Sequence, residues 1–155
     1  MQAHDQTADH PRVVVQGRIA HTSLMLLRSS IGIVFLWFGL LKLFPELSPA
    51  EELATRTIET LTLGLVQPNF SLPALAVWEI AIGLGLLTNR FLRPTLLLLV
   101  LQMMGTFTPL LLFPHETWLQ FPIAPTLEGQ YILKNIVLVS GGLVILALSP
   151  RQRRL

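Results

Sequence analysis

Long apolar blocks alternate with short polar segments along this chain, and the blocks predict membrane-spanning helices. Each block holds about 17–21 residues, and a helix needs about 20 mostly apolar residues to cross a hydrocarbon core about 30 Å thick. The four blocks are Leu24–Phe44, Leu72–Thr88, Thr95–Phe113 and Tyr131–Leu148. The pattern therefore predicts an all-α fold, a four-helix transmembrane bundle formed by residues 21–149.

The polar segments between the blocks predict different structures. Ser48 and Pro49 are typical of a helix start, and the following residues predict an amphipathic surface helix over 49–66. Its predicted apolar face is Ala54, Ile58, Leu61 and Leu65. The segment 114–130 contains three prolines and a glycine, which predict a structured loop before the last span.

Basic residues sort by loop, and this distribution predicts the orientation. The segments rich in basic residues are the two ends of the chain and the turn between the second and third blocks. Cytoplasmic segments of membrane proteins carry an excess of lysine and arginine. We therefore expect residues 1–20 to be a flexible cytoplasmic tail, residues 150–155 to be a basic cytoplasmic tail, and the 49–66 helix to lie outside.

Composition excludes several functions. The chain is 52% hydrophobic and 13% charged, which is far from the balance of a soluble domain. It has no cysteine, which excludes a thiol relay, a cysteine-ligated cluster and a cysteine nucleophile. None of the four histidines lies in the middle of a span, so we expect no metal site and no bundle haem. The net charge of +2 is divided among the loops, so we expect no nucleic-acid partner.

Four charged residues lie within the apolar blocks: Arg28, Lys42, Glu79 and Lys134. An ionisable side chain at membrane depth is costly unless it is paired or reaches water, so each is a functional-site candidate by default. On the first block, charged and small residues share one helical face. That stripe is Arg28, Gly32, Phe35, Gly39 and Lys42. It should point into the bundle, because glycine allows close helix packing.

The predicted depths bring several polar side chains to the outer half of the bundle. The candidates for one ligand pocket there are Lys42, Glu79, Gln102, Thr106, Lys134 and Asn135. With two lysines and two helix N-termini nearby, such a pocket favours a small anion or the carbonyl acceptors of a quinone. The alternative is a structural cluster in which the lysines snorkel or pair with Glu79.

Other residues on the spans receive structural interpretations. Arg28 lies toward the cytoplasmic end of its span, where an arginine commonly anchors to lipid phosphate. The candidate packing glycines are Gly32, Gly39, Gly83, Gly141 and Gly142.

Short motifs resemble the DoxX-like family of small four-helix membrane proteins. They are Trp37-Phe-Gly-Leu-Leu-Lys42-Leu-Phe44, Trp78-Glu-Ile-Ala-Ile-Gly-Leu-Gly-Leu-Leu87, Gly105-Thr-Phe-Thr108 and Tyr131-Ile-Leu-Lys-Asn135. The resemblance, over about residues 24–148, implies an uncleaved bundle in a bacterial inner membrane. Some members are associated with thiosulfate:quinone oxidoreductase complexes and others with redox stress. The acidic outer helix is similar to that of the reactive-chlorine-resistance branch, but Asn135 stands where that branch has an aspartate.

Two functional hypotheses follow. The first is a redox- or stress-linked membrane subunit that binds a quinone or small anion and works with a membrane or redox protein partner. The chain has no resident redox group of its own, so at most it is one subunit of a quinone-linked oxidoreductase. The second is a non-enzymatic accessory subunit or a small-molecule permease. An open cavity lined by Lys42, Glu79 and Lys134 would favour the first, and a closed ion pair would favour the second.

Overall fold

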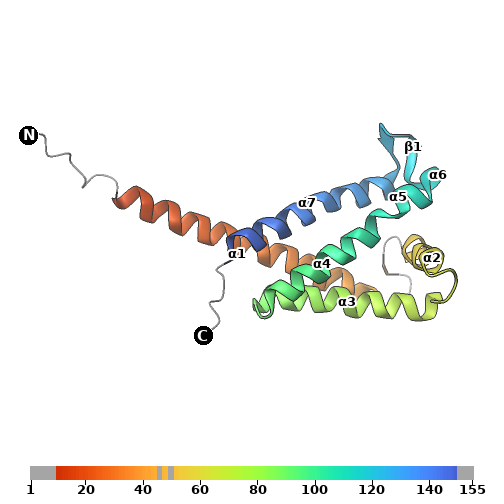
Figure 1. Ribbon diagram of the computed structural model, residues 1–155, viewed down its shortest axis with the longest axis horizontal. Helices are drawn as coiled ribbons and strands as arrows, with labels where there is room; N and C mark the ends of the chain where they lie inside the picture. Colours follow the sequence, from red (N-terminus) through yellow and green to blue (C-terminus); the bar gives the residue numbers. More distant parts are fainter. Residues whose placement is uncertain (1–9, 45–46, 49–50, 150–155) are drawn as a thin grey trace, which may run out of the picture.

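The computed structural model of the protein describes residues 10–44, 47–48 and 51–149, and the side chains from residue 17 onward. Four long helices form the bundle: α1 (His10–Leu41), α3 (Pro68–Thr88), α4 (Leu92–Phe107) and α7 (Leu127–Leu148). The short elements are α2 (Glu51–Leu61), α5 (Pro109–Leu112), α6 (Pro114–Thr117), β1 (Trp118–Gln120) and β2 (Ala124–Pro125). In Figure 1 all five short elements gather at one end of the bundle. The described residues do not include residues 1–9 of the predicted N-terminal tail, the whole predicted tail 150–155, Pro45 or Pro49.

Among the described residues, four helices are long and apolar enough to cross a membrane. They are Gly17–Leu41, Pro68–Thr88, Leu92–Leu112 and Leu127–Leu148. At about 1.5 Å per residue, each of the last three spans just over 30 Å, the thickness of a hydrocarbon core. The all-α four-helix prediction is confirmed, and the protein is a multi-pass membrane protein.

Several helices begin earlier than their apolar blocks. Helix α1 begins at His10, so residues 10–20 are helical, where a flexible tail was predicted. A proline at residue 11 does not prevent this, because the first turn of a helix needs no N–H donors. Helix α7 begins at Leu127 inside the predicted loop, because the Thr126 side chain caps it by accepting a hydrogen bond from the Gly129 N–H at 3.2 Å.

The third span is interrupted between α4 and α5. Pro109 has no N–H to donate to the Gly105 carbonyl, so this carbonyl lacks its usual helical partner. The Thr108 hydroxyl donates to that oxygen at 2.6 Å and the Thr108 N–H at 3.2 Å. The chain therefore stays helical across the break.

The surface helix α2 is shorter than the predicted 49–66 and is rotated about its axis. It ends at Leu61, and Leu63 and Gly64 then adopt positive φ angles of 53° and 79°. Its buried residues are Leu53 and Thr57, not the predicted apolar face, of which Leu61 is 52% exposed and Leu65 86% exposed. Burial of Thr57 is possible because its hydroxyl donates to the Leu53 carbonyl at 2.6 Å.

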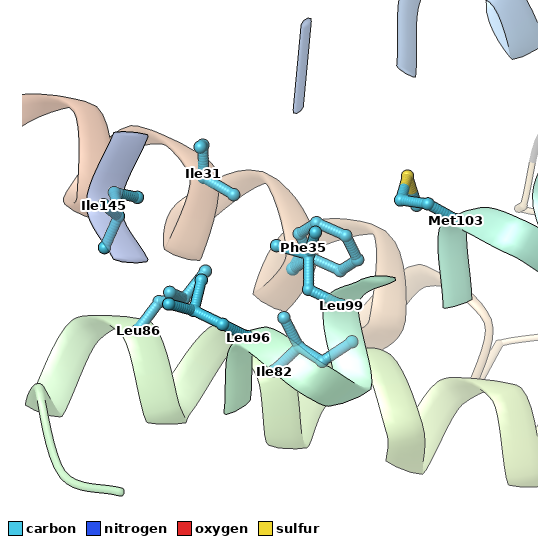
Figure 2. Packing of buried hydrophobic residues seen from close by; sticks show 8 residues of the cluster. All are labelled: Ile31, Phe35, Ile82, Leu86, Leu96, Leu99, Met103 and Ile145. Carbon is cyan, nitrogen blue, oxygen red and sulfur yellow. The ribbon is translucent and has the colours of Figure 1, made fainter. Parts of the chain in front are cut away.

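A single apolar cluster fills the middle of the bundle, and every long helix contributes to it (Figure 2). Its buried members are Ile31 and Phe35 of α1, Ile82 and Leu86 of α3, Leu96, Leu99 and Met103 of α4, and Ile145 of α7. The most extensive packing joins α1 to α3. The remaining neighbours are α3 with α4, α4 with α7 and α7 with α1, so the four helices close into a ring.

Glycines permit the close approach of α1 and α3. A Cβ atom at Gly83 would lie 2.6 Å from the Leu36 backbone nitrogen, and one at Gly39 would lie 2.9 Å from the Ile80 nitrogen. Gly32 and Gly141 meet neighbouring side chains nearly as closely, and Gly142 only at ordinary contact distance. Backbone against backbone leaves no room for any larger residue at Gly83.

Candidate functional site

A hydrogen-bonded group of three side chains lies at the inner face of α1, α3 and α4. The Lys42 Nζ donates to Glu79 Oε2 at 2.7 Å, and the Gln102 Nε2 donates to Glu79 Oε1 at 3.1 Å. The side chains of Lys42 and Glu79 are only 9% and 10% exposed. Both carboxylate oxygens therefore have a donor, as a charge inside a membrane protein requires.

Helix geometry explains how these residues meet. Gly32, Phe35 and Gly39 of the predicted stripe are buried, which confirms that this face of α1 points into the bundle. Glu79 lies on the buried face of α3 with Ala76 and Gly83. A helical side chain leans toward the N-terminus of its own helix, so Lys42, just beyond the end of α1, can reach back toward Glu79.

A cavity of about 900 Å³ opens at the same end of the bundle. Its wall comes from the end of α1, from α2, from the first turns of α3, from α6 and from the start of α7. The lining residues are Lys42, Leu43, Ser48, Glu51, Glu52, Leu53, Thr55, Arg56, Pro68, Asn69, Leu72, Pro73, Glu116 and Glu128. Lys42 therefore connects the cavity to the buried Glu79.

The cavity wall carries more negative than positive charge. It holds four glutamates against Lys42 and Arg56. The sequence predicted a net positive field, and the described wall does not have one. Glu51 Oε2 is buried and has no hydrogen-bond partner among the described residues, so the wall also offers an acceptor.

Arg56 fastens α2 to the opposite side of the cavity. Its guanidinium forms a salt bridge with Glu116 of α6, lies 3.8 Å from Glu52, and stacks 4.6 Å from the ring centre of Phe113. The hydrogen bond to Glu116 raises the pKa of Arg56 above its ordinary value. The guanidinium is therefore a permanent cation that bridges two surface segments.

Lys134 and Thr106 do not join the Glu79 group as predicted. Lys134 is exposed, and its ammonium lies 5.1 Å from the ring centre of Tyr131 on its own helix. The reason is the rotation of α7, whose first turns bury Gly129 and Ile132. Lys134 points away from both, about 140° around the helix from Gly129 and about 160° from Ile132. The Thr106 hydroxyl donates to the Gln102 carbonyl at 2.9 Å, a local helical bond. Half-buried Asn135 follows Lys134 on α7.

Arg28 is half-buried on α1, and its Nε is buried without a hydrogen-bond partner among the described residues. The predicted lipid contact of this residue remains a proposal. The described residues also contain no group of three histidine, cysteine, aspartate or glutamate side chains placed to hold a metal ion.

The sequence did not assign the residues of α2 and α6 that line the cavity. Glu51, Glu52, Arg56 and Glu116 were interpreted only as parts of outer segments. The sequence did contain a signal for this shared location. In a bundle of four spans, the loop after the first span and the loop after the third lie at the same end. A close contact between α2 and α6 still depends on tertiary packing.

Comparisons with known proteins identify a family. The sequence profile described as DoxX matches residues 23–113, more than half of the chain and the region from α1 to the end of α5. The match ends before α7, so the motif at Tyr131–Asn135 lies outside it. No curated protein and no solved structure matches the chain.

Proposed function

We propose that this chain, which belongs to the DoxX family, is a membrane-embedded binding subunit that carries out no redox chemistry unaided. Its ligand occupies the cavity beneath α2, and a membrane or redox protein partner supplies the electron transfer. The observation that carries the proposal is a cavity of about 900 Å³ whose wall includes Lys42, with the ammonium held by Glu79. Ligand pockets are commonly about 300–1,000 Å³ and combine apolar walls with a few fixed polar groups.

Between the two ligand classes predicted from the sequence, the lining charge favours a quinone over a small anion. Four glutamates against two cations would repel a bare anion. A quinone is neutral and accepts hydrogen bonds at its carbonyls, and its reduced form donates through hydroxyls. Lys42 has three N–H groups, of which the bond to Glu79 uses one, and Glu51 offers an acceptor on the same wall.

A second candidate, a structural accessory subunit, is favoured by the closure of the ion pair. Lys42, Glu79 and Gln102 satisfy one another, as they would in a bundle whose polar core only fixes helix register. The permease hypothesis has no such support, because the apolar cluster fills the bundle beyond the cavity. Under either candidate, we propose a bacterial inner membrane with both termini cytoplasmic and the cavity on the outer side.

Photolabelling tests the quinone proposal. The purified full-length protein in nanodiscs is irradiated with a short-chain azido-quinone, and the labelled peptides are identified by mass spectrometry. We expect label on α2 and the start of α3, competed by unmodified quinone and reduced several-fold in Glu51→Leu, which removes the acceptor. Lys134→Met is the matched control, because that charge lies outside the cavity. Label spread over the lipid-facing helices, or equal yields in both variants, would refute the proposal.

A further inference from the structure

The hairpin between α6 and α7 is firmly fixed to the bundle at its base. Strands β1 and β2 pair antiparallel, with Trp118 opposite Pro125. The Trp118 Nε1 donates to the Leu110 carbonyl at 3.3 Å, and the Thr126 N–H donates to the Thr117 carbonyl at 3.0 Å. The hairpin therefore has a defined direction relative to the helices.

The tip of this hairpin is apolar and exposed. Leu119 is 79% exposed, Phe121 67% and Ile123 78%. The segment from Thr117 to Leu127 contains no charged residue. Three large apolar side chains on one uncharged turn are unusual for a surface in water, and such patches mark interaction sites.

The position of the hairpin indicates the partner. It connects the end of the third span, at Leu112, to the start of the fourth, at Leu127, so it lies at the level of the membrane surface. Figure 1 shows it standing out sideways from the end of α7, away from α2 and α3. On either side of the hairpin, Leu111 and Leu127 are 81% and 61% exposed, which continues the apolar outer surface of the spans.

We propose that the hairpin is an interfacial membrane anchor, with Leu119, Phe121 and Ile123 inserted at the boundary between lipid headgroups and acyl chains. The lipid surface fits better than a protein partner because the apolar tip is continuous with the surface that the spans already present to lipid. Trp118 lies at the same level, and its ring packs edge-on against Phe121 at 5.3 Å. Aromatic residues with a polar group favour this interface. Glu116 and Glu128 lie on either side of the hairpin and form part of the cavity wall. The anchor would therefore fix the position of this part of the wall relative to the membrane surface.

Because the natural chain has no cysteine, single-cysteine labelling tests the anchor directly. Ile123→Cys is labelled with an environment-sensitive fluorophore in the full-length protein, in vesicles of phosphatidylcholine and phosphatidylglycerol. Glu59→Cys, on the exposed face of α2, is the matched control. We expect the label at 123 to be blue-shifted, and quenched several-fold more by lipids carrying a shallow spin label than the label at 59. Aqueous iodide should quench the label at 59 more strongly.

Equal iodide quenching at the two positions would overturn the proposal. So would disulfide formation between two Ile123→Cys copies that persists as the lipid-to-protein ratio is raised, because that outcome assigns the tip to a second copy of the chain. A thermal unfolding curve that matches the natural protein establishes that the labelled variant is folded. The measurement does not depend on any ligand in the cavity, so it is independent of the proposed function.

Discussion

The Lys42 ammonium lies 2.7 Å from a carboxylate oxygen of Glu79, although the two residues are 37 positions apart in the chain. The pair joins the end of α1 to the interior of α3 and cancels two charges within the membrane-spanning part of the protein. Gln102 of α4 holds the second carboxylate oxygen, so three of the four long helices meet at one carboxylate.

Removal of Lys42 should destabilise the bundle strongly. Lys42→Met leaves the buried Glu79 without its counter-ion, and breaking a buried pair in this way costs about 3–5 kcal/mol. The unfolding free energy in mixed micelles measures the loss. The double variant Lys42→Met/Glu79→Leu should recover most of it, because no unpaired charge remains, and Lys134→Met should have little effect. A double variant as unstable as Lys42→Met would contradict this account.

Neutralising Glu79 should affect ligand binding more than folding. In Glu79→Gln, the amide oxygen can still accept a hydrogen bond from Lys42. Lys42 also lines the cavity, where water can solvate its ammonium, so the level of folded protein should stay nearer to that of the natural chain than in Lys42→Met. The ammonium is then no longer paired with a negative charge, and its interaction with the ligand changes. We expect an altered yield of azido-quinone labelling at the cavity. Lys134→Met should bind as the natural protein does, and if Glu79→Gln binds equally well, the Lys42–Glu79 pair takes no part in ligand binding.

Two glycine-to-alanine changes should have opposite effects on stability. A Cβ at Gly83 meets the backbone of Leu36, so Gly83→Ala should separate α1 from α3 and cost about 1–3 kcal/mol. A Cβ at Gly105 meets nothing within 4 Å. Gly105→Ala should therefore gain up to about 1 kcal/mol from helix propensity. Thermal unfolding of the two variants in one detergent gives the comparison, and equal shifts would show that α1 and α3 can separate without cost.

Loss of the Arg56 contacts should loosen α2 without unfolding the bundle. Arg56→Ala removes the salt bridge to Glu116 and the stacking on Phe113. Hydrogen–deuterium exchange should then speed up over residues 51–61, while the melting temperature of the protein changes little, because exposed ion pairs contribute little to stability. Glu59→Ala, an exposed change on the same helix, serves as the control. Unchanged exchange in Arg56→Ala would mean that packing on α3 alone holds α2.

The orientation can be read with a reporter. Because the described residues form four spans, we expect both ends of the chain on one side, and the basic loops predict that this side is the cytoplasm. A reporter fused after Arg154 should therefore behave as cytoplasmic in cells. A cysteine introduced at Glu59 should react with a membrane-impermeant thiol reagent added from outside. The reverse result for both sites would place the cavity on the cytoplasmic side.

Sequence periodicity predicted part of the site because the relevant signal was local. Helical spacing alone places Gly32, Phe35, Gly39 and Lys42 on one face of α1. Three of these residues, Gly32, Phe35 and Gly39, are buried, as expected for a face that points into the bundle. The predicted buried face of α2 was wrong, because the helix is rotated about its axis relative to the prediction. In this short helix, apolar and threonine residues lie on adjacent faces, so packing against its neighbour decides which face is buried. The structure directs Lys134 away from Glu79 for a related reason. Depth along a span fixes the height of a residue but leaves its direction around the helix open.

The sequence by itself determined that this protein is a bundle of four membrane-spanning helices, because span length and apolar composition are set locally by the thickness of the bilayer. It also determined that the span charges needed partners. Only the tertiary structure decided which partners they have. Packing of Gly129 and Ile132 turns Lys134 away, whereas the close approach of α1 and α3 brings Lys42 to Glu79. Pairing depends on the rotation and crossing of whole helices, which many contacts determine together and no single segment encodes.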